Sequence, residues 1–435
     1  MIPAQRSFVL LLMLLIIAFG ATLWTALTPL WWAAAGIAAV ALLADAAMTL
    51  GLPQRIEARR ELPGSVSLGA WSDVGIALHN AGSRRVEVNI FDHHPENAEA
   101  RGLPQQHSAP GGATVTLTYQ IRPSQRGELN FGVTQVRILS PLGLWHRNRL
   151  LKNVSSTKVY PDFSVVTKYL LLATDHRLSQ LGIRKRRRRG EGQDFHQLRE
   201  YREGDALRQI DWKATARTRK LISREYQDER DQEIILLIDC GKRMLAQDDE
   251  LTHFDHSLNA ILLLAYVALR QGDAVGLGTF SGETRWFSPS KGLGTINRLL
   301  NAAYDLYPST LAPDYASAAL EVLARQRKRA LVVVLTNLRE EDSDDLIPAL
   351  QTLKQRHLVL LASMREQAVQ DVTDQEVAEF DDALRLAATY DYMTQRQRAL
   401  EKIQANGILC TDVLPQELSV SLVNRYLEIK RGGIL

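Results

Sequence analysis

Apolar residues follow three different patterns along the chain, and the first covers its start. Two long apolar runs, residues 7–27 and 30–50, contain one charged side chain, Asp45. A helix rising about 1.5 Å per residue needs roughly 20 residues to cross the hydrocarbon core of a bilayer. Only Thr28 and Pro29 separate the runs. The pattern predicts a transmembrane helical hairpin over residues 1–52, with Asp45 hydrated near the end of the second span.

The charges that flank the hairpin predict its orientation. Arg6 precedes the first span, and Arg55, Arg59 and Arg60 follow the second, whereas the turn is uncharged. Basic residues favour the cytoplasmic side of a membrane. We therefore expect a bacterial inner-membrane protein with both ends and all later residues in the cytoplasm. The alternative is a cleaved signal peptide, but the first apolar run is long for one and a second run follows it.

The second pattern is an alternation of apolar and polar residues between positions 53 and 163. Val115, Leu117 and Tyr119 alternate with threonines, and Val86 and Val88 alternate with polar residues in the same way. Alternation with a period of two is typical of half-buried strands. Short strands with glycine-containing turns predict an antiparallel β-sandwich over residues 53–163. Residues 140–150 are expected to form a turn and then an edge strand.

The third pattern begins at residue 230, where apolar runs alternate with amphipathic segments. The expected strands cover residues 234–239, 274–280, 330–336, 358–363 and 407–412, and the expected helices cover residues 254–270, 295–305, 315–326, 344–355, 381–405 and 416–430. Strands that are apolar throughout belong to sheets covered on both faces. Residues 230–435 are therefore predicted to form a doubly wound, mostly parallel α/β sheet. Ligands bind at the carboxyl ends of such strands, which here carry Asp239, Thr336 and Asn337.

Residues 164–229 join the two predicted domains. A helix is expected over residues 164–181, and six consecutive basic residues follow it. They are Arg184, Lys185, Arg186, Arg187, Arg188 and Arg189. Such a run either attracts anionic lipid headgroups or forms a solvated connector, and both interpretations remain open. A nucleic-acid interface is less favoured, because no aromatic residues are interleaved.

A charged stretch with one large aromatic residue, positions 201–212, lies later in the same connector. Arg208, Asp211 and Trp212 could dock a partner, because arginine and tryptophan often dominate interfaces. The structural alternative, which we favour, is that Arg208 and Arg217 bind carboxylates and fasten the segment to the α/β domain.

Composition and charge exclude several classes of protein. The chain has 435 residues, of which 46% are hydrophobic and 23% charged, as expected of a globular protein. Its formal net charge is only +3, so it is not expected to bind nucleic acid. Two cysteines, Cys240 and Cys410, do not form a disulfide framework.

The sequence contains few motifs of known chemistry. It has no GxxxxGK[ST] phosphate loop, HExxH or GxSxG motif. His253 and His256 could contact a metal ion, but no companion cluster with ligand spacing accompanies them. Cys240 lies beside the strand-end Asp239 and could be a nucleophile, although no base is identifiable nearby.

Four segments resemble a bacterial family known as domain of unknown function fifty-eight. The longest spans residues 195–244 (FHQLREYREGDALRQIDWKATARTRKLISREYQDERDQEIILLIDCGKRM). The others are RGELNFGVTQVRILSPLGLW (126–145), VYPDF (159–163) and VNRYLEIKRGG (423–433). The resemblance extends over nearly the whole chain, including the hairpin. It implies a membrane-anchored protein whose α/β domain is similar to von Willebrand factor type A domains.

The resemblance also implies a degenerate metal-ion-dependent adhesion site. In the complete site, an Asp, two serines, a Thr and a second Asp hold a divalent cation. Asp239 matches the first Asp, whereas Gly241 and Arg243 stand at the serine positions. Pro313, before Asp314, stands at the threonine position, and Asn337 stands where a second acid is common. Too few oxygen ligands remain for Mg²⁺, so no cofactor is expected.

Arg243 suggests a substitute for the cation. We expect its guanidinium to pair with Asp239 or with the carboxylate of a partner. The family further implies cooperation with a MoxR-type AAA+ ATPase. The expected function is that of a non-catalytic, membrane-anchored protein-binding adaptor or assembly factor. The alternative is a hydrolase or transferase that acts through Asp239 and Cys240, and a third possibility is a lipid-sensing scaffold that uses the arginine run.

Overall fold

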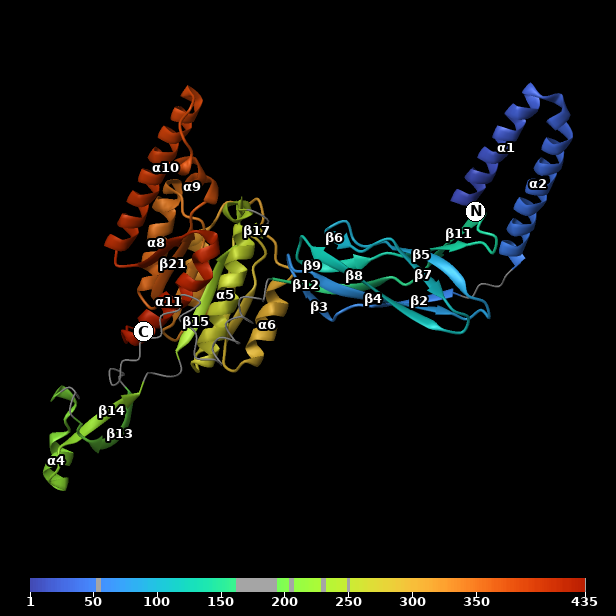
Figure 1. Ribbon diagram of the computed structural model, residues 1–435. Helices are drawn as coiled ribbons and strands as arrows, with labels where there is room; N and C mark the ends of the chain where they lie inside the picture. Colours follow the sequence, from blue (N-terminus) through green and yellow to red (C-terminus); the bar gives the residue numbers. More distant parts are fainter. Residues whose placement is uncertain (52–55, 162–193, 203–206, 228–231, 249–250, 435) are drawn as a thin grey trace. The chain divides into compact units, whose positions relative to one another are not determined.

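The computed structural model describes residues 1–51, 56–161, 194–202, 207–227, 232–248 and 251–434 (Figure 1). The chain divides into two compact units, residues 1–160 and 161–435. The helix expected over residues 164–181 and the basic run 184–189 lie outside the described residues.

Two apolar helices dominate the start of the first unit. They are α1 (Gln5–Leu23) and α2 (Thr28–Gly51), joined by the 3-10 turn η1 (Thr25–Leu27). By length and composition, both are able to cross a membrane. The predicted turn at Thr28 and Pro29 is wrong, because these residues begin α2. Proline is well accommodated in the first turn of a helix, where its missing N–H has no helical acceptor.

The rest of the first unit consists of three sheets. A five-stranded sheet has the order β1-β11-β10-β5-β7. Its strands are β1 (Ile2–Pro3), β5 (Val86–Asp92), β7 (Gln105–Ala109), β10 (Thr134–Leu139) and β11 (Trp145–Leu151). A four-stranded sheet, β2-β4-β8-β6, is formed by β2 (Ile56–Glu61), β4 (Ser72–Asn80), β6 (Ala98–Arg101) and β8 (Thr114–Pro123). A three-stranded sheet, β3-β12-β9, is formed by β3 (Ser65–Ser67), β9 (Gly127–Phe131) and β12 (Ser155–Tyr160).

The turn and strand expected over residues 140–150 are present, but β11 is not the edge strand. Ile2 pairs with His146 and Pro3 with Trp145, so the short strand β1 covers β11. Two residues ahead of an apolar helix give no periodic signal, and the sequence therefore did not predict this strand.

A buried ion pair joins two of these sheets. The Arg60 guanidinium on β2 donates to both carboxylate oxygens of Asp92 on β5, at 2.8 and 2.5 Å, and the two side chains are at most 1% exposed. Tyr119 on β8 also donates to Asp92, at 2.6 Å. Burial, and then the Asp92 charge, raise the pKa of Tyr119, so its hydroxyl keeps the proton it donates. Arg60 is thus a core residue of the β domain, which is formed by the strands between Ile56 and Tyr160. It is not one of the solvated basic residues that were expected to flank the predicted membrane span.

A small hairpin comes first among the described elements of the second unit. Strand β13 (Asp194–Glu200) pairs with β14 (Ile222–Gln227), and between them lie η3 (Leu207–Gln209) and α4 (Trp212–Thr218). Asp211 caps α4 by accepting from the backbone of Lys213 and Ala214, and it also accepts from Arg224 Nε at 2.9 Å. Helix capping of this kind explains Asp211 in structural terms.

The larger part of the second unit is built on a six-stranded sheet in the order β19-β18-β15-β20-β21-β22. The strands are β15 (Glu233–Asp239), β18 (Ala274–Phe280), β19 (Trp286–Ser290), β20 (Leu331–Leu335), β21 (Leu358–Met364) and β22 (Leu409–Val413). All neighbours are parallel except β19, which runs antiparallel to β18. The predicted mixed α/β architecture is confirmed. Strand β19 was not predicted, because it is short and contains Pro289.

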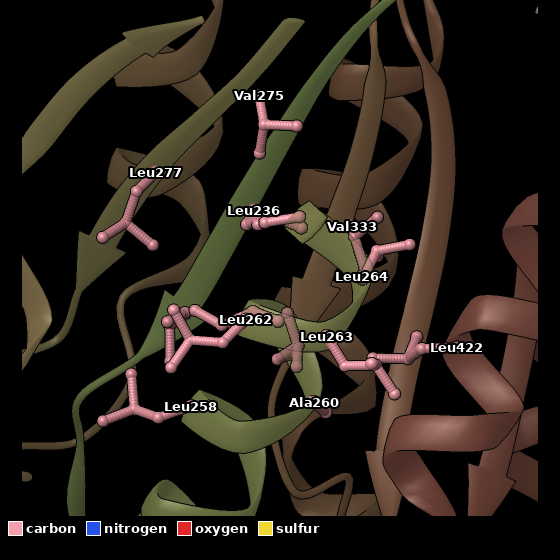
Figure 2. Close-up of a cluster of buried hydrophobic side chains, with 14 of the residues drawn as sticks. Leu236, Leu258, Ala260, Leu262, Leu263, Leu264, Val275, Leu277, Val333 and Leu422 are labelled. Carbon is pink, nitrogen blue, oxygen red and sulfur yellow. The ribbon is translucent and has the colours of Figure 1, made fainter. Parts of the chain in front are cut away.

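Helices cover both faces of this sheet. On one face lie α5 (His253–Arg270), α6 (Gly294–Ala303) and α11 (Leu418–Arg431). On the other lie α7 (Tyr315–Arg325), α8 (Ser343–Lys354) and α10 (Phe380–Ala405), with the short α9 (Gln367–Asp374) preceding α10. Leu236 packs with the α5 side (Figure 2). Ile235 and Leu237 pack with the α7 side. The alternation along β15 therefore supplies two separate cores from one continuous apolar run.

Candidate functional site

The candidate site lies where the two central strands of the α/β sheet end. Strands β15 and β20 are parallel neighbours, and Ile238 is paired with Leu335. Asp239 ends β15, and Thr336 and Asn337 directly follow β20. The chain continues from β15 to α5 on one face and from β20 to α8 on the other. Such a switch point opens a crevice in many α/β sheets, so its side chains are the natural place to seek a site.

Asp239 is completely buried at this point. Its Oδ1 accepts from the Gly241 backbone N–H at 2.7 Å, and its Oδ2 accepts from Thr336 Oγ1 at 2.7 Å. Burial raises the pKa of Asp239, and the hydrogen bonds from Thr336, Gly241 and Ser281 offset only part of that effect. The structure thus brings Asp239 and Thr336 together as predicted, but the carboxylate is held by the protein itself.

Gly241 leaves no space for the serine of a complete adhesion site. A Cβ built at this glycine would be 2.8 Å from the Leu311 carbonyl oxygen and 3.0 Å from Asp239 Oδ1. The Leu311 carbonyl is fixed in place, because it accepts from the Lys242 backbone N–H at 2.8 Å. Among the described residues no group of three or more histidine, cysteine or acidic side chains could hold a metal ion. The residues present therefore do not fit the cation of an adhesion site.

Arg243 does not pair with Asp239, so this half of the prediction is wrong, whereas pairing with the carboxylate of a partner stays a prediction. Its Nη2 donates to Glu341 Oε2 and to Asp342 Oδ1, both at 3.0 Å, and its side chain is 8% exposed. The hydrogen bond from Arg243 lowers the pKa of Glu341. Glu341 and Asp342 lie on the 3-10 turn η5 (Glu340–Asp342), which leads from β20 to α8. Arg243 therefore ties the loop after β15 to the loop after β20, and its charge is already balanced by two carboxylates.

Asp314 is a helix cap at the start of α7. Its Oδ1 accepts from the Ser317 backbone N–H at 2.9 Å, and this hydrogen bond lowers the pKa of Asp314. Its own backbone N–H donates to Ser281 Oγ at 3.3 Å. The carboxylate is engaged by the helix that it caps, which is the ordinary role of an aspartate at this position.

Asn337 belongs to a buried polar network that the sequence did not reveal. Its Nδ2 lies 2.9 Å from Glu366 Oε1 and 3.3 Å from His253 Nδ1, and its Oδ1 accepts from Arg396 Nη1 at 3.2 Å. The arginine can only donate and the carboxylate accepts, so the amide orientation is determined. The second N–H of Asn337 then points to His253 Nδ1. On the other side of the ring, His253 Nε2 lies 2.6 Å from Asp248 Oδ2.

Arg396 anchors this network from the middle of α10. It is 4% exposed, and its Nη2 donates to Asp412 Oδ1 at 2.6 Å and to Ser363 Oγ at 2.7 Å. Burial acts to raise the pKa of Glu366, but hydrogen bonds led by that from Asn337 hold it below its ordinary value. Arg396 gave no sequence signal, because its partners Asp412 and Ser363 lie on other elements, 16 and 33 positions away, outside the reach of helical periodicity. The network explains His253 as a structural residue.

Three other residues were predicted to take part in a site, and the structure describes the side chains of two of them. Trp212 is 68% exposed, as a docking residue would be. Arg208 lies in η3, and its side chain is outside the described residues. Cys240 is fully buried, whereas an attacking thiolate must reach its substrate.

Comparison with known families identifies the region that carries these features. Residues 197–404 match the family described as "Protein of unknown function DUF58". The matched DUF58 region begins in β13 and ends in α10, so it contains the strand-end site, and of the polar network described above only Asp412 lies outside it. This match bears out the resemblance to that family over residues 197–404.

A curated relative matches the chain over a similar length. The chain is 22% identical over 237 residues to "Uncharacterized protein YeaD" of Bacillus subtilis strain 168. The alignment covers 53% of this chain and 55% of YeaD, so the chain spans about half the length of that relative.

Solved structures resemble only parts of the chain. An aerotolerance-related membrane protein of Bacteroides fragilis is 18% identical, with a TM-score of 0.24 over 30% of this chain and 67% of that one. A Salmonella alpha-2-macroglobulin is 19% identical, with a TM-score of 0.19 over 24% of this chain and 7% of that one. At these scores the similarities carry no argument about the fold or function of the whole chain.

Proposed function

We propose that this chain is a non-catalytic, membrane-anchored adaptor or assembly factor that binds other proteins. The DUF58 region would serve as a von Willebrand type A-like binding domain with a degenerate adhesion site. A MoxR-type AAA+ ATPase is the proposed partner. The proposal extends the family match, which itself assigns no activity.

One observation carries the proposal, and it is the closed state of the strand-end site. The Asp239 carboxylate is fully buried and accepts from Thr336 and from the Gly241 backbone. A general base or metal ligand needs lone pairs directed at substrate or ion. Here the hydrogen bond from Thr336 joins the end of β15 to the loop after β20, and the hydrogen bond from Gly241 holds the loop after β15. A site of this kind holds loop shape, which suits a binding surface.

The apolar residues around the site indicate where a partner would bind. Leu311 is 60% exposed and Leu245 is 43% exposed. Leu311 accepts from Lys242 through its carbonyl oxygen, and Leu245 ends the 3-10 turn η4 (Lys242–Leu245). Leu245 therefore lies in the loop after β15, whose shape Asp239 and Arg243 hold, and Leu311 lies in the connection between α6 and α7 that is hydrogen-bonded to this loop. Exposed leucines on loops of fixed shape are suited to protein contact.

Membrane anchoring forms the second half of the proposal. Both α1 and α2 are long and apolar enough to cross a membrane. The basic Arg6 at the start of α1 favours a cytoplasmic position for that end and for the residues that follow the hairpin. The enzyme alternative, with Asp239 and Cys240 acting on a substrate, is not favoured by any observation among the described residues.

The proposal is tested by capturing partners of the full-length chain from its own membranes with a photo-crosslinker. The Leu311→Asp variant is compared with Leu293→Asp, because Leu293 is 54% exposed. Leu293 follows β19, whose last residue pairs with the start of β18, so it lies near the amino-terminal ends of the parallel strands and away from the candidate site. We expect an AAA+ ATPase with the wild type and with Leu293→Asp, and at least a tenfold loss with Leu311→Asp. Recovery that is equal in both variants, or a capture without any AAA+ ATPase, contradicts the proposal. Because the proposed function does not use the Cys240 thiol, Cys240→Ala should capture the same ATPase as the wild type.

A further inference from the structure

The first unit contains a cavity of about 660 Å³, outside the candidate site described above. It lies between residues 2–8 of the chain and the outer face of the five-stranded sheet. Cavities of roughly 300–1,000 Å³ are typical of small-molecule sites. Its lining includes Gln5, Arg6 and Phe8 from the first turns of α1, so it lies at the end of the proposed membrane span.

The strand register explains why polar side chains line the cavity. Val136 and Ile138 on β10 are fully buried, so Arg137 between them points to the opposite, outer face. Arg137 is paired with Asn89 on β5, and Leu139 with His146 on β11. Residues that are directly paired share a face of the sheet. Asn89, Arg137 and His146 therefore converge on one surface, and all three line the cavity.

The N-terminal segment completes the cavity and is fixed in place. The Ala4 backbone N–H donates to the Leu144 carbonyl at 2.9 Å, and Ser7 Oγ donates to the same carbonyl. The Arg6 side chain lies over Gly143, where a Cβ would be 2.8 Å from Arg6 Nη1. A side chain at position 143 would therefore have to shift the Arg6 guanidinium from its place beside the cavity.

The charge of the lining favours an anion. Arg6 and Arg137 contribute two guanidinium groups, and Glu87 is the one acidic residue that lines the cavity within the described part of the chain. The Nδ1 atom of His146 is enclosed and has no hydrogen-bond partner among the described residues. Burial, and then the Arg137 charge, lower the pKa of His146, so its imidazole is neutral and able to donate from Nδ1 or accept there.

We infer that this cavity binds the phosphate group of an anionic phospholipid, with Arg6 and Arg137 as charge-assisted donors. Arginine presents several N–H groups in a plane and suits phosphate oxygens. Phe8 is 59% exposed and Ile2 is 45% exposed, and both border the cavity. They offer an apolar path for acyl chains beside α1. The inference rests on the membrane anchoring in the proposed function and concerns a site remote in sequence from the proposed partner surface.

The test measures lipids retained by the full-length protein in detergent, by native mass spectrometry, with phosphatidylglycerol and phosphatidylcholine as probes. The variant is Arg137→Gln, and the control is Arg84→Gln, which removes an exposed arginine that does not line the cavity. We expect the wild type and the control to retain phosphatidylglycerol in preference to phosphatidylcholine. Arg137→Gln should lower that retention about tenfold, since one charge-assisted hydrogen bond is lost. Arg6 is left unchanged because it also orients the hairpin.

A second arm titrates the delipidated protein with inorganic phosphate by calorimetry. Phosphate binding that depends on Arg137, without a preference for phosphatidylglycerol, would support the anion site and assign it to free phosphate. Equal retention of phosphatidylglycerol by Arg137→Gln and the wild type, or no binding of either probe, overturns the inference. Carbonate extraction of the chain from membranes would instead contradict the anchoring in the proposed function, and the phosphate titration would still test the cavity.

Discussion

Asp45, in the second apolar helix, accepts a hydrogen bond from the hydroxyl of Ser140, 95 residues later in the chain. The same carboxylate accepts from the backbone N–H groups of Leu142 and Leu144, at 3.0 and 3.1 Å. It is fully buried, so the expectation of a hydrated carboxylate is wrong. Asp45 satisfies the turn between β10 and β11, and it thereby joins the helical hairpin to the β domain.

Replacing Asp45 by alanine is expected to loosen this turn. Two buried donors, on Ser140 and Leu144, and the partly buried N–H of Leu142 would lose their acceptor, at about 1–3 kcal/mol for each buried group left unsatisfied. Hydrogen exchange of the full-length protein in detergent should show residues 140–145 exchanging at least tenfold faster. Asp45→Asn keeps one acceptor oxygen, so its exchange rates should lie between those of the wild type and those of Asp45→Ala. The control Asp73→Ala removes an exposed aspartate on β4 that accepts from Gln120. Exchange that is unchanged in Asp45→Ala would show that the carboxylate does not hold the turn.

The buried pair of Arg60 and Asp92 allows a prediction with a neighbouring control. Removing one partner of a buried ion pair typically costs about 3–5 kcal/mol, because the other charge remains buried. Arg60→Leu should therefore destabilise the β domain by about that amount in urea unfolding. Arg59→Leu, at the exposed adjacent position on β2, should change the free energy of unfolding by about 0.5 kcal/mol or less. Similar effects of the two substitutions would contradict the assignment of Arg60 to the core.

Periodicity predicted most of the fold, because burial acts on residues close together in sequence. Residues 234–238 are all apolar and Asp239 follows them, which predicts a buried strand over residues 234–239. The structure has β15 at Glu233–Asp239. Partner choice was not predictable in the same way. Arg243 contacts Glu341 and Asp342, about a hundred positions away, and Arg396 contacts Asp412 and Ser363. Each arginine had many possible acidic partners, and only the strand order selects among them.

Gly241 offers a direct test of why the adhesion site does not fit a cation. Gly241→Ser restores a ligand residue type, but its Cβ would be 2.8 Å from the Leu311 carbonyl. We expect a loss of about 1–3 kcal/mol in stability, as for other overpacked sites. Gly294→Ser is the control, because a Cβ there meets nothing within 4 Å. Calorimetry with Mg²⁺ should detect no binding to either variant or to the wild type. Micromolar Mg²⁺ binding that Asp239→Ala abolishes would contradict this account.

Asp239, at the end of β15, and Asp314, the cap of α7, should affect the stability of the fold with opposite dependence on pH. Burial raises the pKa of Asp239 above its ordinary value of 3.8. As pH rises above that value, the unfolded chain loses the proton first, so Asp239 destabilises the fold increasingly until its raised pKa is passed. The hydrogen bond from the Ser317 backbone lowers the pKa of Asp314, so Asp314 stabilises the fold above pH 3.8 and loses that contribution as pH falls through its lowered pKa. Relative to the wild type, Asp239→Asn should therefore gain melting temperature between pH 4 and pH 7.

The matched variant Asp314→Asn retains a good helix cap but removes the charge. Relative to the wild type, it should lose melting temperature as pH rises from about 3 to 5. Both variants are measured by calorimetric scans of the full chain across this range, with each difference taken at the same pH. Thr336 can reverse its hydroxyl and accept from an asparagine at position 239, since Tyr315 OH lies 3.3 Å from Thr336 Oγ1 and either atom can donate. If Asp239→Asn becomes less stable than the wild type as pH rises, the carboxylate is ionised in the folded protein, and the closed strand-end site would have to be reconsidered.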